Sequence, residues 1–392
     1  MSVVRSGLVR AVAAALVLAL VVYVAATTLS DAWVRSQEVP TSGRARLPEV
    51  LYNAPASVAT TDRRGPVGPT AVVFAGTQVL DGLVGELADP WIAVSSRTGD
   101  YRAVSGPELP PAAPGAVMVA PDGDLLAWAA DDVVVLHDTL TGRSRSLEVP
   151  AAGAVGAFSP DGGRLLVHAG GQLGVLDVDS GDLTPLGDVP PQAVAGAVWR
   201  PDGEAVSLVD TGLAEIDVAS GRRTVSDVRL AADAQLAWAP SGTRLVSLQE
   251  LSGARRLQVW QRTPDGRVTA AVTVPTEGIS LARLLGFYSD DTVAVVGLAL
   301  ETGGIQHVFE VPVEGARSVA EIGQLPSRGD NWIGAETLAV ASGALQGGTK
   351  AFEEPRWPWS HRAKLVSSLV VALFALGMYL TRRPRRRPPR IK

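Results

Sequence analysis

The most informative gap in the composition is the complete absence of cysteine from a chain of 392 residues. Without thiols the protein has no disulfide framework, no cysteine nucleophile and no cysteine-ligated zinc or iron–sulfur centre. Aromatic residues are scarce at 5%, although nine of them are tryptophan, and charged residues make up only 19%. Hydrophobic residues reach 46%, which excludes an intrinsically disordered chain.

Lysine and long hydrophobic runs are also rare. The only lysines are Lys350, Lys364 and Lys392, so arginine supplies nearly all the positive charge. Only two segments lack charge for long enough to cross a bilayer, which excludes a polytopic membrane protein. All 40 acidic residues lie between 31 and 361, where 24 basic residues leave a net charge of −16. This acidic middle argues against nucleic-acid binding, which needs clustered lysine and arginine.

The first uncharged segment, residues 11–30, consists mostly of alanine, valine and leucine. A helix of this length matches a hydrocarbon core of about 30 Å. We interpret it as an uncleaved membrane anchor. The alternative is a secretory signal peptide with a weak small-residue cleavage site at 24–26. The segment is longer than the roughly 7–15 apolar residues usual in a signal peptide, which favours the anchor.

The second uncharged segment, residues 365–381, is near the lower length limit of about 17 residues for a membrane span. Lys364 and Arg382 flank it, and Trp357, Trp359 and Tyr379 lie where interfacial aromatic residues are expected. A buried core helix is the alternative, but such a helix is seldom followed by an arginine-rich tail. We therefore predict a second membrane helix.

The distribution of basic residues predicts the orientation of both spans. Seven positive charges lie between 382 and 392, and Arg5 and Arg10 precede the first span. The positive-inside rule places both termini in the cytoplasm. We therefore expect residues 31–361 on the outer side of the cell membrane.

A short turn motif recurs through the acidic middle. Proline followed by Asp-Gly or Ser-Gly recurs at regular spacing at Pro121, Pro160, Pro201 and Pro240. The prolines are spaced by 39, 41 and 39 residues, and three of the turns follow the aromatic residues Phe158, Trp199 and Trp238. Proline presets φ for a turn, Asp bonds nearby backbone N–H groups, and Gly accepts a positive φ. Each motif therefore predicts a tight turn between two strands.

A second turn motif follows the first by about twenty residues. Its clearest copies, at 95–99, 138–142, 177–181 and 217–221, end in Gly, and the last three begin with Asp. Looser versions occur at 263–266 and 311–315. Two hairpins in each unit of about forty residues give four strands per unit, which is typical of propeller blades.

These motifs resemble the repeats of the TolB-like and WD-repeat-like β-propeller families, and the resemblance covers roughly residues 71–345. The predicted fold is all-β, a propeller of seven four-stranded blades between two transmembrane helices. Seven blades follow from dividing this length by about forty residues, with residues 47–52 completing the final blade. In the six-blade alternative, the last two strands near Trp332 pair with the hairpin around 95–99. The arginine-rich composition is similar to that of actinobacterial-type proteins.

The predicted organisation has six parts. They are a cytoplasmic N-terminus and transmembrane helix (1–30), an extracytoplasmic tether with a possible blade-closing strand (31–70), the propeller (71–345), a second tether (346–363), a second transmembrane helix (364–381) and a basic cytoplasmic tail (382–392).

Motifs for chemistry are few. The chain has no Gly-x-Ser-x-Gly elbow, no Walker loop and no Gly-x-Gly-x-x-Gly fingerprint. The four histidines lack metal-ligand spacing. Residues 177–182 resemble a calcium loop and residues 159–163 the core of a sialidase Asp-box, but sister turns lack both features, so we interpret both as structural turns. We assign no catalytic, cofactor-binding or metal residue, and no cofactor.

The sequence therefore predicts a membrane-anchored extracytoplasmic propeller that acts as a protein-binding or scaffold module in the cell envelope, and not as an enzyme. Expected partners are the lipid bilayer, through both helices, and another envelope protein. Residues 249–256 depart most from the repeat and, with residues 261–267, are candidate contact segments; a tolerated insertion is the alternative. The alternative is an envelope enzyme acting on glycans or peptides, with carboxylates gathered in the propeller channel. Three or more acids in a deep channel pocket would favour the enzyme, and an apolar rim would favour binding.

Overall fold

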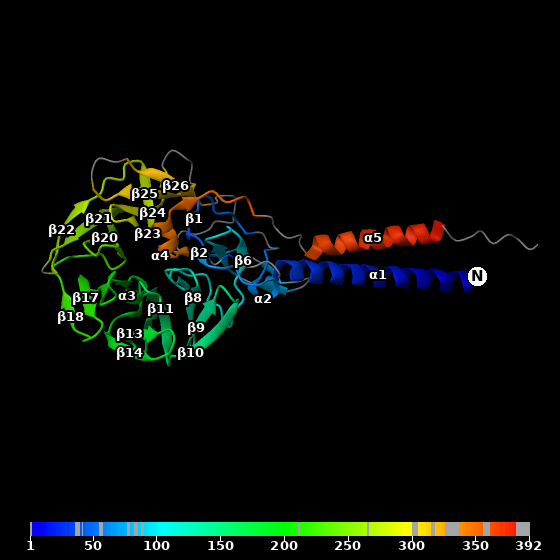
Figure 1. The fold of residues 1–392 in the computed structure, drawn as a ribbon, viewed down its shortest axis with the longest axis horizontal. Helices are drawn as coiled ribbons and strands as arrows, with labels where there is room; N and C mark the ends of the chain where they lie inside the picture. The colour runs from blue at the N-terminus through cyan, green and yellow to red at the C-terminus, as the bar shows by residue number, and fades with distance from the viewer. Residues whose placement is uncertain are drawn as a thin grey trace, which may run out of the picture.

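The architecture is a ring of six sheets with two long helices at one side (Figure 1). The computed structural model describes residues 2–35, 40, 42–54, 58–76, 79–81, 85–87, 90–210, 212–264, 266–299, 305–314, 318–325, 337–355 and 361–381. The predicted all-β propeller of four-stranded blades is confirmed, with six blades. The prediction of seven blades is wrong, because the units counted separately near 72–76 and 337–340 belong to one blade.

Each blade takes four antiparallel strands that follow one another in the sequence, except blade 1, whose innermost strand comes from the far end of the ring. From the innermost strand outward, blade 1 contains β27 (Ala339–Val340), β2 (Thr70–Ala75), β5 (Trp91–Ser95) and β6 (Tyr101–Ala103). Blade 2 contains β7 (Met118–Val119), β8 (Leu125–Ala130), β9 (Val133–Asp138) and β10 (Arg143–Glu148). Blade 3 contains β11 (Ala152–Phe158), β12 (Arg164–Ala169), β13 (Gln172–Asp177) and β14 (Leu183–Asp188).

The remaining three blades repeat this arrangement. Blade 4 contains β15 (Val198–Trp199), β16 (Ala205–Val209), β17 (Leu213–Asp217) and β18 (Arg223–Val225). Blade 5 contains β19 (Gln235–Trp238), β20 (Arg244–Leu251), β21 (Ala254–Arg262) and β22 (Val268–Thr273). Blade 6 contains β23 (Ile279–Ser289), β24 (Thr292–Ala299), β25 (Gln306–Pro312) and β26 (Ala320–Gln324).

Short elements connect or supplement the blades. They are the hairpin β3 (Val79–Asp81) and β4 (Gly85–Leu87), the parallel pair β1 (Leu47–Pro48) and β28 (Thr349–Lys350), and the helices α2 (Thr61–Arg64), α3 (Pro191–Ala195) and α4 (Ser342–Gly347). The long helices are α1 (Ser2–Arg35) and α5 (His361–Thr381).

The first repeating turn folds as its residues predict. In blade 2, Gly123 has a φ of +82° and its N–H donates to the carbonyl oxygen of Ala120 at 2.9 Å. The carboxylate of Asp122 accepts a hydrogen bond from the backbone N–H of Asp124 at 3.0 Å. The glycines at the same position in the next three blades also have positive φ, namely Gly162, Gly203 and Gly242.

The second repeating turn uses its aspartate in the same way in successive blades. Asp177 Oδ1 accepts hydrogen bonds from the N–H groups of Asp179 and Ser180 at 3.1 and 2.8 Å. Asp217 Oδ1 accepts from the N–H of Ser220 at 2.8 Å. The segment that resembles a calcium loop thus uses this carboxylate to hold a turn.

The two turns define the faces of the ring. Because neighbouring strands in a blade are antiparallel, the turn after the first strand and the turn after the third lie at the same end of the blade. We call this end the turn face. The hairpins between the second and third strands lie at the opposite end, which we call the hairpin face.

The hydrophobic core consists of six clusters, and each fills the seam between two neighbouring blades. In β8, for example, Leu126 and Trp128 pack toward blade 1, whereas Ala127 packs toward blade 3. Middle strands are therefore buried on both faces, which explains why they read as continuous apolar runs.

Ring closure joins the two ends of the propeller in blade 1. Val340 and Ala339 of β27 pair with Val72 and Val73 of β2. Among the described residues, one strand of the C-terminal region joins the blade, where two were expected in the six-blade alternative. Trp332, near which the second was expected, lies outside the described residues. The segment 47–52 completes no seventh blade. It packs in the seam between blades 6 and 1, where Val50 bridges Gln324 at the end of β26.

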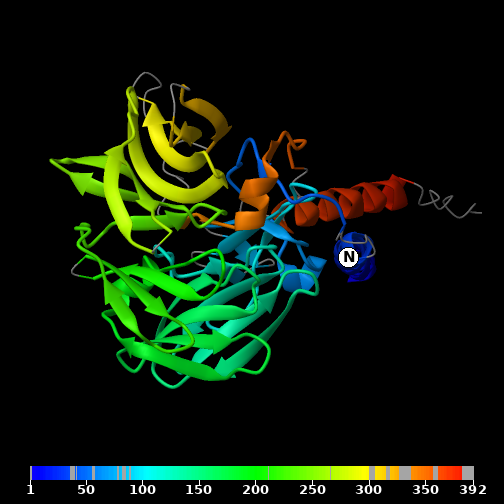
Figure 2. The same cartoon turned by 60° about the vertical axis from the view of Figure 1, so that its left-hand side comes forward.

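The helices α1 and α5 run in opposite directions, contact each other and extend away from blade 1 (Figure 1), and Figure 2 shows that their axes cross at an angle. Within the described chain, α1 is the one helix with an apolar stretch long enough to cross a membrane, Val12–Leu29. A signal sequence would have the same property. The apolar part of α5, Lys364–Gly377, is shorter. The predicted basic tail lies outside the described residues.

Candidate functional site: the central cavity

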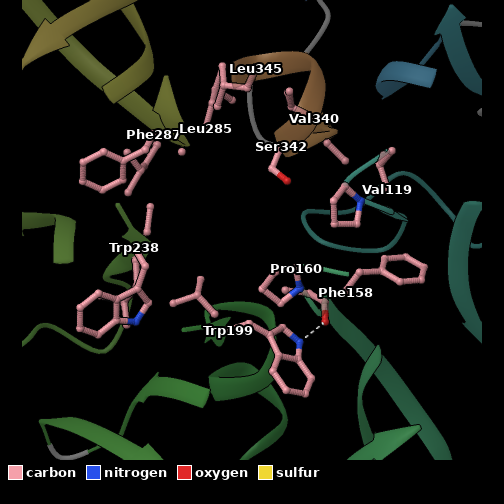
Figure 3. Close-up of a pocket in the computed structure, with 18 of the residues that line it drawn as sticks. Val119, Phe158, Pro160, Trp199, Trp238, Leu285, Phe287, Val340, Ser342 and Leu345 are labelled. Atoms are coloured by element: carbon pink, nitrogen blue, oxygen red, sulfur yellow. Dashed lines mark hydrogen bonds between the residues drawn. The ribbon is translucent and has the colours of Figure 1, made fainter. Parts of the chain in front are cut away.

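A cavity of about 340 Å³ lies on the axis of the ring (Figure 3). The innermost strand of every blade contributes to its wall, and α4 contributes Ser342, Leu345 and Gln346. A cavity of this size is in the range of small-ligand sites. The site therefore arises from closure of the ring, because no single blade contains it.

Four equivalent prolines surround the cavity at the turn face. They are the repeat residues Pro121, Pro160, Pro201 and Pro240. The sequence predicted the turns correctly but gave them only a structural role. Their position on the axis follows from the fold, because each turn begins where an innermost strand ends.

The aromatic residues before these turns contribute to the seams rather than to the centre. Figure 3 shows the rings of Phe158, Trp199 and Trp238 directed away from the cavity. Trp199 Nε1 donates to the carbonyl oxygen of Ala157 at 2.9 Å, and Trp238 Nε1 donates to Ser207 Oγ at 3.0 Å. Each indole thus joins its own blade to the preceding one and is not available to a ligand.

Most of the side chains that line the cavity are apolar, although polar and apolar atoms contribute about equally to its exposed wall. Among the described residues of the wall, the polar side chains apart from the tryptophans are Arg283, Ser342 and Gln346. Ser342 is exposed and its hydroxyl points toward the centre (Figure 3). No Asp or Glu belongs to the described lining, so the carboxylate cluster expected for the enzyme alternative is not found there.

Helix α4 replaces the first repeating turn in blade 1, where the chain cannot run directly from β27 to β2. The N–H of Gly343 donates to the carbonyl oxygen of Pro121 at 2.8 Å, and Leu345 is only 1% exposed. The helix is therefore fixed to the neighbouring turn, and it covers part of the cavity at the turn face.

The two segments predicted to contact a partner lie on opposite faces. Residues 249–256 form the tip of the β20–β21 hairpin, at the hairpin face, with Ser252 and Gly253 at φ of +55° and +78°. Residues 261–267 form the turn after β21, at the turn face, although Asp265 lies outside the described residues. The two segments therefore do not form one contact region.

The histidines are distributed over separate elements. His137 is fully buried, its Nδ1 lies 3.0 Å from Ser144 Oγ, and burial lowers its pKa to about 4, against the opposing charge of Asp138. His168 lies in blade 3, and His307 in blade 6 lies 2.8 Å from Glu321. Among the described residues no group of three potential metal ligands occurs.

Comparison with known proteins gives similarity in fold only. No family model matches the chain, and no curated protein matches it. Among solved structures, TolB from Acinetobacter baumannii is 12% identical, with a TM-score of 0.40 over 66% of this chain and 69% of that chain. Oligogalacturonate lyase from Vibrio parahaemolyticus is 14% identical, with a TM-score of 0.41 over 66% and 74%. Hydrazine synthase from Kuenenia stuttgartiensis is 19% identical, with a TM-score of 0.41 over 56% and 68%.

The six four-stranded blades confirm the β-propeller that the repeats predicted, and TolB is among the propellers that are similar in fold. The WD-repeat part of the resemblance stays a prediction. Our expectation that the protein is not an enzyme is overturned, because the similar propellers include a lyase and a synthase. At these identities and TM-scores the likeness carries no substrate with it. An enzymatic function is as open as a binding function.

Proposed function

We propose that the protein is a membrane-anchored β-propeller of the cell envelope whose central cavity binds part of another envelope molecule, most simply a protein segment. The observation that carries this proposal is a cavity to which all six blades contribute, lined mostly by apolar side chains but with polar and apolar atoms about equally exposed in its wall. Such a wall suits a ligand that buries carbon surface and also forms hydrogen bonds, as a protein segment does.

The anchor in this proposal is a pair of membrane helices, α1 and α5. Small residues face the contact between them, since Ala19, Ser368 and Ala372 are only 4%, 2% and 3% exposed. Small residues allow close helix packing in lipid. Large apolar side chains on the remaining surface are exposed: Leu16, Val17, Leu20, Val21, Val24, Val366, Val370, Leu373 and Phe374.

A lipid environment would cover the apolar surface that α1 and α5 expose, whereas in water this surface would stay in contact with solvent. This supports the predicted second span, although α5 is the shorter of the two. With the positive-inside rule, it supports the predicted topology, with the propeller outside and both termini in the cytoplasm. The division of the chain into the six predicted parts belongs to the same proposal.

Site-specific crosslinking tests the binding site. We expect a photo-crosslinking amino acid at Ser342, which faces the cavity, to capture one envelope protein in native membranes. The same group at Ser146, exposed on the outer strand β10, is the control and captures much less of it. Equal capture from both positions would contradict the proposal.

An enzyme that acts on a ligand in the same cavity is the second candidate, and the same positions separate it from simple binding. Ser342→Trp places a large side chain in the cavity, whereas Ser146→Trp does not. Turnover of wall glycans or peptides by the full chain, abolished by Ser342→Trp and kept in Ser146→Trp, would establish an enzyme.

A further inference from the structure

The outermost strands of the six blades differ in how their outer edges are protected. The outer side of such a strand pairs with no strand of its own blade. Alternate residues on this side direct backbone N–H and C=O groups outward, where they can pair with any extended chain. Proteins usually protect these edges with charged residues, proline, short strands or covering segments. Five of the six blades have one of these protections.

The first tether covers the outer strands of blades 1 and 6. Ala103 N–H in β6 donates to the carbonyl oxygen of Ala59 at 2.8 Å. Leu51 N–H donates to the carbonyl oxygen of Gln324 at the end of β26 at 3.0 Å, and Gln324 N–H donates to the carbonyl oxygen of Glu49 at 2.8 Å. Both contacts are parallel β-bridges. The protein therefore already places extended chain on two of its outer edges.

The outer strands of blades 2, 3 and 4 are protected by their own sequences. The strand β10 contains two arginines and one glutamate among six residues. The strand β14 contains Pro185, which has no N–H to donate. The strand β18 has only three residues and begins with Arg223. Each of these edges is therefore a poor site for another strand.

The outer strand of blade 5 differs from the other five. The sequence of β22 is Val-Thr-Ala-Ala-Val-Thr, without charge or proline, and in the described part of the chain it pairs with β21 alone. Val272 is 65% exposed, more than any other large apolar side chain in the described part of the ring. Thr269 and Thr273 are also exposed. Valine and threonine favour strands, so β22 offers an open edge for strand addition.

The position of β22 indicates where its occupant comes from. Figure 1 shows β22 across the ring from α1 and α5, and its free side faces away from these helices. If both helices are anchored in one bilayer, the free sides of two neighbouring copies both point away from that bilayer. Two such copies cannot pair through β22, because a symmetric pair needs the same edges to face each other. The occupant is therefore a different molecule.

We propose that β22 binds an extended segment of a partner protein as a fifth strand of blade 5. Backbone hydrogen bonds along the edge supply the affinity, as in other cases of strand addition. The partner segment is uncharged and rich in valine, isoleucine or threonine, since β22 presents no charge to pair with and Val272 needs an apolar neighbour across the strands. This site is separate from the central cavity, and only the exclusion of a second copy rests on the proposed anchor.

Peptide binding to the full chain in non-ionic detergent tests the inference. The probe is a fluorescein-labelled peptide in which valine and threonine alternate over six residues, and fluorescence anisotropy measures its binding, with protein-free detergent as the blank. A second peptide has the same side chains but methyl groups on two adjacent backbone nitrogens, so that neither of its edges can pair fully. We expect the first peptide to bind and the second to bind much more weakly.

A charge on the edge should weaken binding of the first peptide. We expect Val272→Lys to lower the affinity about five-fold, because a lysine there removes the apolar cross-strand contact. The matched control is Val225→Lys, which changes a valine that is 54% exposed on the outer strand β18 and should bind like the wild type. If Val272→Lys does not fold, Thr269→Lys replaces it, with Thr224→Lys as its control, since both threonines are exposed.

Three results would overturn the inference. They are equal affinity in the edge variant and its control, equal binding of the methylated peptide, and a wild-type dimer in light scattering that Val272→Lys dissociates, which would make a second copy the occupant. Loss of peptide binding in Ser342→Trp would place the peptide in the central cavity and overturn it as well. Edge binding that persists while crosslinking from Ser342 fails would refute the proposed function of the cavity alone.

Discussion

At the scale of single residues, Asp124 has a strongly raised pKa among the carboxylates that the structure describes. Burial raises its pKa to about 6, the charges of Asp122 and Asp138 add to the effect, and Arg97 opposes it. The residue follows the first repeating turn of blade 2, so its position is fixed by the fold. At neutral pH the carboxylate is ionised although its environment favours the neutral form.

The variant Asp124→Asn should therefore be more stable than the wild type at neutral pH. A folded-state pKa raised above the unfolded value of about 3.8 means that the wild type loses stability as the pH rises from about 4 to 6. We expect a melting temperature about 1–2 °C higher for the variant at pH 7.5, and no difference at pH 4.

Thermal unfolding at both pH values, followed by circular dichroism, measures this difference. The variant Asp233→Asn removes an exposed carboxylate between blades 4 and 5 and serves as the control for the loss of one charge. A lower melting temperature for Asp124→Asn at pH 7.5 would show that the carboxylate makes a stabilising contact.

In the candidate site, single residues predicted the turns but not the contacts that their side chains make. The repeated prolines and tryptophans identified the turns correctly from their spacing. Their environments were not predictable, because Trp238 bonds to Ser207 in the preceding blade and Pro121 meets its equivalents only around the axis. Such contacts depend on the number of blades and the closure of the ring, which local sequence does not encode.

At the scale of elements, α4 and the two tethers form one junction. Leu47 N–H donates to the carbonyl oxygen of Gly348 at 2.9 Å, and Arg44 donates to the carbonyl oxygen of Gln346 at 3.0 Å. The backbone of Ala45 approaches Gly347 so closely that a Cβ there would lie 1.7 Å from the carbonyl oxygen of Ala45. Only glycine allows this approach.

The variant Gly347→Ala should separate α4 from the first tether. We expect the melting temperature to fall by roughly 5 °C or more, because backbone atoms on both sides of the contact must move. Gly163→Ala is the control, since the nearest atom to its Cβ would be 3.7 Å away. An unchanged melting temperature for Gly347→Ala would show that the junction contributes little to stability.

The short elements were predicted least well. The helix α4, with six residues, was missed because it carries no measurable periodicity, and β27, with two residues, was assigned to a separate unit near 337–340. The long hairpins were predicted because turn chemistry and apolar runs agree there. Strand β27 of blade 1 lies at the C-terminal end of the propeller sequence, and the other three strands of the blade lie at its N-terminal end. Counting these two parts as separate units gave the seventh blade.

At the scale of the whole molecule, the six-bladed ring is tested by a crosslink across its closure. Val72 and Val340 are antiparallel partners, with a Cα separation of about 4.5–5.5 Å. A disulfide accepts Cα separations of about 4.4–6.8 Å. Because the chain contains no other cysteine, the variant Val72→Cys/Val340→Cys forms only this bond within one molecule.

We expect the oxidised variant to run faster than the reduced one on a denaturing gel and to melt several degrees higher, because the bond closes a very long loop. The control Val94→Cys/Val340→Cys joins strands β5 and β27, which are separated by β2, and should not form the bond. Failure of the first pair to oxidise would contradict closure of the ring between β2 and β27.

Ring closure through β27 also imposes an order on the synthesis of the protein. The strand β2 is made early, and its sequence Thr-Ala-Val-Val-Phe-Ala contains neither proline nor charge. Until Ala339 and Val340 emerge from the ribosome, its inner edge has no partner, and an open apolar edge favours aggregation. The edge therefore stays open until almost the whole ring has been translated, and we expect a product truncated before residue 339 to aggregate more readily than the full chain.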